Sequence, residues 1–154
     1  MTDKRYYIAY GSNLNVGQMR MRCPHATILG TANLKGWELL FKGSKTGSYL
    51  TIEESEGGTV PVVIWEVTAT DEAALDRYEG FPSYYIKEEW PVHMGDSSEI
   101  KGMIYIMNMI RQSPPHSSYY KGIEDAYRKL GLRSQIKTVL EPALERSLQR
   151  GTRW

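Results

Sequence analysis

The chain opens with an aromatic and apolar run that stops abruptly at a glycine. Residues 5–10 read Arg-Tyr-Tyr-Ile-Ala-Tyr, and Gly11, Ser12 and Asn13 follow at once. Aromatic residues and isoleucine favour strands, whereas glycine and small polar residues favour turns. A glycine also lets a ligand approach the main chain, and the amides around Ser12 and Asn13 could converge on a negatively charged group. The pattern predicts a first strand followed by a ligand-binding turn.

Size and composition restrict the classes of protein to which the chain can belong. With 154 residues, 41% of them hydrophobic and 24% charged, it is expected to form a single globular domain over residues 1–154. A net charge of +1 gives no bulk attraction to nucleic acid or to an anionic membrane. There is no secretory signal and no apolar run of the ~20 residues that span a membrane, and the single cysteine, Cys23, excludes an internal disulfide. We therefore expect a cytoplasmic protein, a monomer or a homodimer, that binds neither nucleic acid nor membrane.

The rest of the pattern predicts mostly strands up to residue 108 and helices afterwards. Strands are expected at 27–33, 37–42, 46–53, 60–68, 84–92 and 100–108, with turns at 35–36, 54–59 and 95–98. Helices are expected from Asn15 to 23, over 71–78 with Thr70 as the cap, from 117 or 118 to 130, and from 134 onward, where Pro142 either kinks the helix or opens a new one. This segregation favours an α+β fold over a parallel α/β fold. The many short strands favour a small mixed β-barrel or a strongly curled sheet with flanking helices.

Several familiar catalytic arrangements do not occur in the sequence. The histidines, His25, His93 and His116, are too far apart in the chain to form a recognisable ligand pair. Ser12 lies in Gly-Ser-Asn rather than in the Gly-x-Ser-x-Gly elbow of hydrolases, and Cys23 is interpreted as a packing residue. No nucleotide-binding glycine motif is present. We therefore expect no metal and no cofactor.

Glu79 is the acidic residue that the pattern singles out. It lies in Tyr-Glu-Gly-Phe-Pro at 78–82, where a predicted helix gives way to a turn. Aromatic neighbours would desolvate its carboxyl, and desolvation raises the pKa of a carboxyl from about 4.3 towards neutrality, where proton transfer is efficient. The alternative interpretation is a solvated glutamate at a helix end. On its own this segment does not decide between the two.

Taken together, these segments resemble the γ-glutamylcyclotransferase-like family, which includes the AIG2-like proteins. Residues 10–13 resemble the family's substrate-binding loop, residues 78–80 the segment with its catalytic glutamate, and residues 114–119 the segment that brings a tyrosine to the pocket. A further family tyrosine matches Tyr84 or Tyr85, of which Tyr85 is favoured. The resemblance extends over residues 6–132, and Gly-Ser-Asn is similar to the γ-glutamylcyclotransferase branch. It implies Glu79 as the catalytic residue and, as substrate-binding residues, Tyr10, Gly11, Ser12, Asn13, Leu14, Tyr85 and Tyr119.

The resemblance implies an acyltransferase- or lyase-type enzyme that forms a lactam without metal or cofactor. The α-amine of a γ-glutamyl compound attacks its own γ-carbonyl, which releases 5-oxoproline and a free amine or amino acid. Glu79 would remove a proton from the α-amine and return it to the departing nitrogen, while residues 11–13 hold the α-carboxylate and the oxyanion. Two alternatives remain: a cyclotransferase that removes a γ-glutamyl group from a larger amine, as in biosynthetic deprotection, or a non-catalytic small-molecule binding protein of the same fold.

Overall fold

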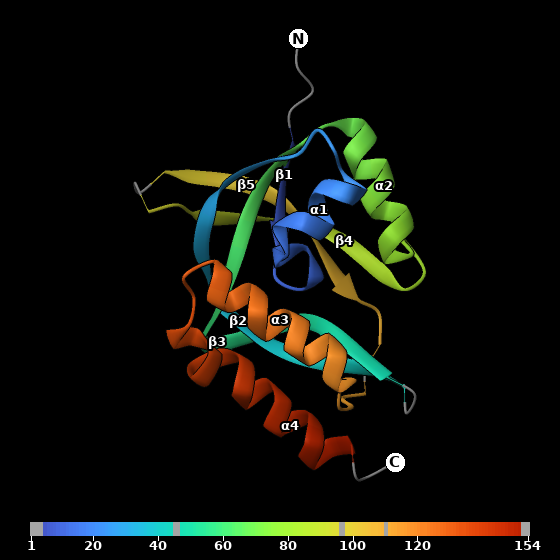
Figure 1. Ribbon diagram of the computed structural model, residues 1–154, viewed down its shortest axis with the longest axis vertical. Helices are drawn as coiled ribbons and strands as arrows, with labels where there is room; N and C mark the ends of the chain where they lie inside the picture. The colour runs from blue at the N-terminus through green and yellow to red at the C-terminus, as the bar shows by residue number, and fades with distance from the viewer. Residues whose placement is uncertain (1–4, 45–46, 96–97, 110, 152–154) are drawn as a thin grey trace.

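A mixed five-stranded sheet forms the centre of the computed structural model, which describes residues 5–44, 47–95, 98–109 and 111–151 (Figure 1). Its strands are β1 (Arg5–Ala9), β2 (Thr27–Ser44), β3 (Gly47–Val67), β4 (Tyr85–His93) and β5 (Glu99–Met107). They lie in the order β2-β3-β1-β5-β4, with β1 parallel to β5 and the other neighbours antiparallel. The α+β class is confirmed, and the described strands form an open sheet rather than a closed barrel.

The long β2–β3 hairpin differs from the pattern expected from the sequence. The predicted strands 27–33 and 37–42 are one strand, β2, and 46–53 and 60–68 belong to one strand, β3, so the predicted turns at 35–36 and 54–59 are wrong. The pairing register shifts between Lys35 and Trp37, and Gly36 has a φ of 87°. Glycine and polar residues therefore form a β-bulge inside the ladder instead of a turn that ends it. Residue 46, and residues 96 and 97 of the predicted turn at 95–98, lie outside the described residues.

The helices are a 3-10 turn η1 (Ser12–Leu14), α1 (Val16–Arg22), α2 (Ala69–Glu79), α3 (Ser117–Lys129), a π-helical segment η2 (Ile136–Leu140) and α4 (Glu141–Gly151). Asn15 caps α1 as expected, because its Oδ1 accepts a bond from the Gln18 N–H. Pro142 is the second residue of α4, but η2 runs into α4 without a break, so Pro142 lies within a continuous helical run over 134–151 beside its π-helical segment and does not open a separate helix.

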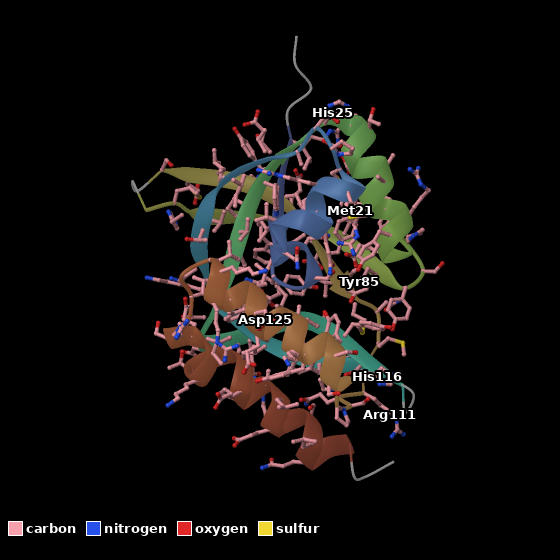
Figure 2. All side chains as sticks on the ribbon, in the orientation of Figure 1. Met21, His25, Tyr85, Arg111, His116 and Asp125 are labelled. Atoms are coloured by element: carbon pink, nitrogen blue, oxygen red, sulfur yellow. The ribbon has the colours of Figure 1, made fainter. Side chains whose placement is uncertain are left out.

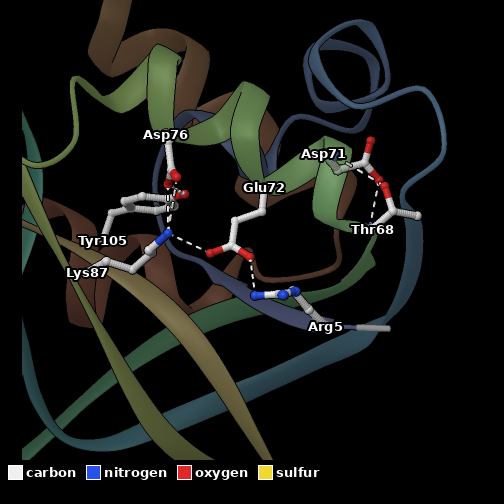
Figure 3. Close-up of polar contacts among 7 residues, drawn as sticks. All are labelled: Arg5, Thr68, Asp71, Glu72, Asp76, Lys87 and Tyr105. Carbon is white, nitrogen blue, oxygen red and sulfur yellow. Dashed lines mark hydrogen bonds and ion pairs between the residues drawn. The ribbon is translucent and has the colours of Figure 1, made fainter. Parts of the chain in front are cut away.

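The cap of α2 is Thr68 and not Thr70. Thr68 Oγ1 accepts a hydrogen bond from the Asp71 N–H at 3.2 Å, and Asp71 Oδ2 accepts one from the Thr68 N–H at 3.0 Å (Figure 3). This reciprocal pair is a capping box, which satisfies two main-chain donors that a helix start leaves free. At its other end α2 stops at Gly80, which has a φ of 68°, so Glu79 is the last helical residue.

The helices form two groups. Figure 1 shows α1 and α2 together towards the top of the view, and α3 and α4 towards the bottom. The core between sheet and helices is anchored by fully buried residues such as Ile8, Trp65 and Leu75. Trp65 Nε1 also donates a 3.1 Å hydrogen bond to the carbonyl oxygen of Asn13, which attaches the first turn to the core. No helix in the described part of the chain has the length and apolar character needed to cross a membrane.

Candidate active site

A cavity of about 310 Å³ lies where the turn after β1, the end of α2, the start of β3 and the start of α3 meet. The cavity wall is largely phenolic, because eight of its thirteen lining residues are tyrosines. In the view of Figure 2, Tyr85 lies between the α1–α2 group and α3. The structure brings together seven residues predicted from the sequence: Tyr10, Gly11, Ser12, Asn13, Glu79, Tyr85 and Tyr119.

Leu14 is the predicted site residue that does not line this cavity. Its side chain is buried in the hydrophobic core, and its N–H donates to the Gly11 carbonyl oxygen at 2.9 Å. An apolar side chain in this turn gains more from the core than from a polar cavity. The structure therefore gives the Leu14 side chain the role of holding η1 against the core, and substrate binding by Leu14 stays a prediction that the lining of this cavity does not support.

Three residues at the end of β1, Gly11, Ser12 and Asn13, line the cavity. The first hydrogen bond of the turn is the one from Leu14 to Gly11, so the N–H groups of Ser12 and Asn13 precede it. The Ser12 hydroxyl lies 3.1 Å from the Tyr78 hydroxyl, which ties the turn to α2. A Cβ added to Gly11 would lie 3.6 Å from Leu50 Cβ and 3.7 Å from the Tyr119 hydroxyl. Gly11 therefore keeps free the space between the turn and the opposite wall.

Asn13 is engaged by the protein at both ends of its side-chain amide. Its Nδ2 donates a 3.0 Å hydrogen bond to the Tyr7 hydroxyl, and its Oδ1 accepts a bond from Arg22. The residue is only 2% exposed. Its side chain thus holds the turn in place, which leaves the backbone N–H as the group through which Asn13 can meet a ligand.

Glu79 enters the cavity from the end of α2. Burial raises the pKa of its carboxyl to about 7, although the positive charge of Arg22 acts in the opposite direction and lowers this pKa. The Arg22 guanidinium lies 3.6 Å from the centre of the Tyr78 ring and also bonds to Gln18. A carboxyl that titrates near neutral pH is suited to accepting a proton and returning it within one cycle.

The tyrosines of the cavity fall into two sets by exposure. We call Tyr7, Tyr10, Tyr85 and Tyr105 the floor, because they are buried, and Tyr49, Tyr78 and Tyr84 the rim, because they are 46%, 47% and 37% exposed. Tyr84 and Tyr85 therefore both line the cavity, at different depths. The floor hydroxyls bond to the protein; that of Tyr10 donates to the Tyr105 carbonyl oxygen and that of Tyr85 to the Leu50 carbonyl oxygen.

Tyr119, on α3, closes the cavity opposite the turn. Its hydroxyl oxygen accepts a 3.1 Å hydrogen bond from the Leu50 N–H, so its own proton remains available to a ligand. Burial is the main reason that the pKa values of Tyr119 and of the floor tyrosines are raised. These phenols are therefore neutral donors and acceptors at physiological pH.

A charged network that the sequence analysis missed fixes α2 to the sheet (Figure 3). Lys87 Nζ lies 2.5 Å from Glu72 Oε2 and 2.9 Å from Asp76 Oδ1. Tyr105 donates a 2.6 Å bond to Asp76 Oδ1, and Arg5 bonds to Glu72 at 2.7 Å. The sequence contains one signal for this network. Asp76 lies one helical turn before Glu79, which places both side chains on one face of α2.

The histidines do not gather at this cavity. His25 and His116 lie far apart in Figure 2, and His93 is at the end of β4. Among the described residues, no three His, Cys, Asp or Glu side chains are arranged to hold a metal ion.

The structure thus combines an open mixed sheet with a cavity that is lined mostly by tyrosines and by a single carboxyl. The family model described as "Gamma-glutamyl cyclotransferase, AIG2-like" matches residues 7–124, and the chain belongs to this family. It is 34% identical to the Bos taurus γ-glutamylcyclotransferase over 134 residues, which are 82% of this chain and 71% of the relative. The Homo sapiens γ-glutamylcyclotransferase is 33% identical with the same coverage.

Solved structures give the same result. One described as γ-glutamyl cyclotransferase superposes with a TM-score of 0.80 at 29% identity, covering 88% of each chain. A structure of a Homo sapiens protein described as uncharacterized superposes with a TM-score of 0.80 at 30% identity and covers 89% of this chain. The family resemblance and the enzyme class expected from the sequence are confirmed.

Proposed function

We propose that this enzyme converts a small γ-glutamyl compound into 5-oxoproline and a free amine, with Glu79 as the group that carries the proton. The observation that supports this most directly is the position of Glu79. Its carboxyl, with a pKa of about 7, lines the same cavity as the main chain of residues 11–13. A substrate seated on that turn is therefore within the same small space as a base of suitable strength.

Protonation of the α-amine is the chemical obstacle that Glu79 removes. An α-amine has a reference pKa of about 8, so it is mostly an ammonium ion without a free lone pair at neutral pH. The Glu79 carboxylate takes one proton, and the neutral nitrogen then attacks the γ-carbonyl carbon. The new C–N bond closes a five-membered lactam, Glu79 returns its proton to the departing nitrogen, and the original amide C–N bond breaks. The ring nitrogen then gives its second proton to the Glu79 carboxylate, which passes it to the released amine, so that the amine leaves as an ammonium ion.

Ring closure within one molecule needs positioning more than it needs a strong nucleophile. Well-oriented intramolecular reactions have effective molarities of ~10⁵ M or more. The neutral tyrosine walls hold the substrate without introducing competing charges. The N–H groups of Ser12 and Asn13 and the Tyr119 hydroxyl are the donors that can meet the α-carboxylate and the oxyanion formed at the γ-carbonyl.

The test of this proposal is release of 5-oxoproline from γ-glutamyl dipeptides by the wild-type enzyme and by Glu79→Gln. Glutamine keeps the shape of the side chain but cannot cycle a proton, so kcat is expected to fall ~10²–10⁴-fold with a modest change in KM. Glu89→Gln, at an exposed position on β4, is the matched control and should retain wild-type kcat. Near-normal turnover by Glu79→Gln would remove Glu79 from the proposed role.

A further inference from the structure

The exposure of the tyrosines that line the cavity increases from its buried floor to its exposed aromatic rim. The rim tyrosines come from three different segments: Tyr49 from β3, Tyr78 from α2 and Tyr84 from the residues before β4. Glu79 and η1 account for the glutamyl end of a substrate, so the amine that leaves must occupy the part of the cavity nearer to solvent. That part is bordered by the three half-exposed rings.

Each rim ring is held by a partner and is therefore a preformed surface. Tyr49 packs edge-on against Tyr119 with ring centres 5.1 Å apart, and Tyr84 packs against Tyr85 at 5.4 Å. Tyr78 has the Arg22 guanidinium on its ring, as described above, and its hydroxyl contacts Ser12. Rings that are already fixed lose little conformational entropy when a ligand stacks on them.

The charge distribution around the cavity disfavours an anionic leaving group. Among the described residues that line it, there is no lysine, arginine or histidine, and Glu79 is the only carboxylate. Arg22, which lies on the Tyr78 ring, is already engaged by Asn13 and Gln18. A second carboxylate on the leaving amine would thus meet no lining cation and would be repelled by ionised Glu79. An aromatic or apolar group would instead bury its surface against the rings.

We propose that Tyr49, Tyr78 and Tyr84 form the leaving-group subsite, and that the enzyme prefers γ-glutamyl compounds whose amine carries an aromatic or long apolar group over those whose amine carries an acidic one. This inference rests on the proposed function, because it assigns the second half of the same substrate. Stacking on even one or two rings corresponds to a preference of about tenfold in kcat/KM.

The first experiment compares four substrates that share the γ-glutamyl group. We expect kcat/KM to be about tenfold higher for γ-glutamyl-phenylalanine than for γ-glutamyl-alanine, because the leaving amines of these two compounds carry the same single carboxylate. The value should be higher still for γ-glutamyl-phenethylamine, whose amine carries no carboxylate, and lowest for γ-glutamyl-aspartate, whose amine carries two. Equal values across the series, or a preference for the alanine or aspartate compound, would overturn the inference.

The second experiment moves the preference by changing the rim. Tyr49→Ala and Tyr84→Ala should each reduce the ratio of kcat/KM for the phenylalanine compound to that for the alanine compound, about three- to tenfold. Ile86→Ala is the matched control, because Ile86 is 38% exposed on β4 but does not line the cavity, and it should leave the ratio unchanged. Rim variants that lower kcat/KM for both substrates by the same factor would overturn the assignment of a leaving-group subsite.

A binding measurement separates this inference from the proposed function. If none of the four compounds yields 5-oxoproline, the proposed function fails, and the rim is then judged by the Kd of each compound for Glu79→Gln in titration calorimetry. A lower Kd for the two aromatic compounds supports the subsite, whereas equal Kd values, or no binding at all, overturn it.

Discussion

The phenol of Tyr105 donates a 2.6 Å hydrogen bond to Oδ1 of Asp76, the residue one helical turn before Glu79 on α2. Lys87, on β4, holds the same carboxylate and also that of Glu72. These bonds therefore attach α2 to the sheet one helical turn before the proposed catalytic carboxyl, on the same face of the helix. Since Tyr105 is also part of the cavity floor, one side chain connects the substrate space to the anchor of the helix.

Removing the Tyr105 hydroxyl should loosen that anchor. We expect Tyr105→Phe to lower kcat by about tenfold with a smaller change in KM, because misplacing a base by a fraction of an ångström costs rate more than binding. Steady-state kinetics over a range of pH measures the effect. Tyr127→Phe is the control, since the Tyr127 hydroxyl is buried, has no hydrogen-bond partner among the residues that the structure describes, and does not line the cavity. Unchanged kcat for Tyr105→Phe would show that the anchor does not position Glu79.

A methyl group at position 11 should reduce substrate binding without preventing folding. In Gly11→Ala the new Cβ would lie at ordinary contact distances from Leu50 and Tyr119, and it would project into the space that a ligand uses. We expect KM to rise about tenfold or more, a loss typical of a displaced polar contact, and the melting temperature to stay within a few degrees. Gly122→Ala, on α3 where a Cβ would meet no atom within 4 Å, should leave KM unchanged. An unaltered KM in Gly11→Ala would place the substrate away from this turn.

Arg22 should set the pH at which the enzyme becomes active. Its positive charge favours the ionised form of Glu79, so Arg22→Met is expected to raise the pKa of that carboxyl further above its ordinary value. The carboxylate is the form that accepts the proton, and the acid limb of kcat/KM against pH should therefore move to higher pH. Arg20→Met, at an exposed position on the same helix, is the control for the general loss of a charge. A limb that stays at the wild-type position would mean that Arg22 does not act on the group that titrates.

Burial of Glu79 should cost stability at alkaline pH. Its pKa is about 7 in the folded protein against 4.5 as the ordinary value, so between these two pH values the folded state retains a proton that the unfolded state has released. The free energy of unfolding from this group is therefore highest below pH 4.5 and falls as the pH rises towards about 7, by on the order of 3 kcal/mol.

Glu79→Gln removes this titration and provides the measurement. Urea unfolding at pH 8 should find the variant more stable than the wild type by on the order of 3 kcal/mol, and at pH 4 the two should agree closely. Glu89→Gln controls for loss of a carboxyl at an exposed position. If the difference between Glu79→Gln and the wild type is the same at both pH values, the carboxyl is not desolvated in the folded protein.

The local parts of the site could be predicted from the sequence because short-range chemistry determines them. Gly11 follows a strand, Asn15 caps the next helix, and Gly80 ends α2 directly after Glu79. The sequence also contains the signal for the cap of α2, which lies at Thr68 and not at the expected Thr70. Thr68 is followed three residues later by Asp71, the acidic partner of a capping box, whereas Thr70 is followed there by Ala73.

Other features of the fold and of the site have no signal in the neighbouring sequence. Glycines at bulges and at turns have the same composition, so the continuity of β2 and β3 depends on pairing between distant residues. The rim and floor tyrosines come from separate elements that only the folded sheet brings together, and nothing near Tyr49 or Tyr105 in the chain marks them as cavity residues. The network around Lys87 likewise joins β1, α2, β4 and β5.

The raised pKa values of the buried phenols have a consequence for the electric potential inside the cavity. Because Tyr7, Tyr10, Tyr85, Tyr105 and Tyr119 remain protonated well beyond neutral pH, none of them adds a formal charge to the field that the reacting atoms experience. One proton on Glu79 then decides whether the interior carries zero or one unit of negative charge. In the proposed mechanism each turnover begins and ends with the same interior potential, because Glu79 passes to the departing amine every proton that it accepts.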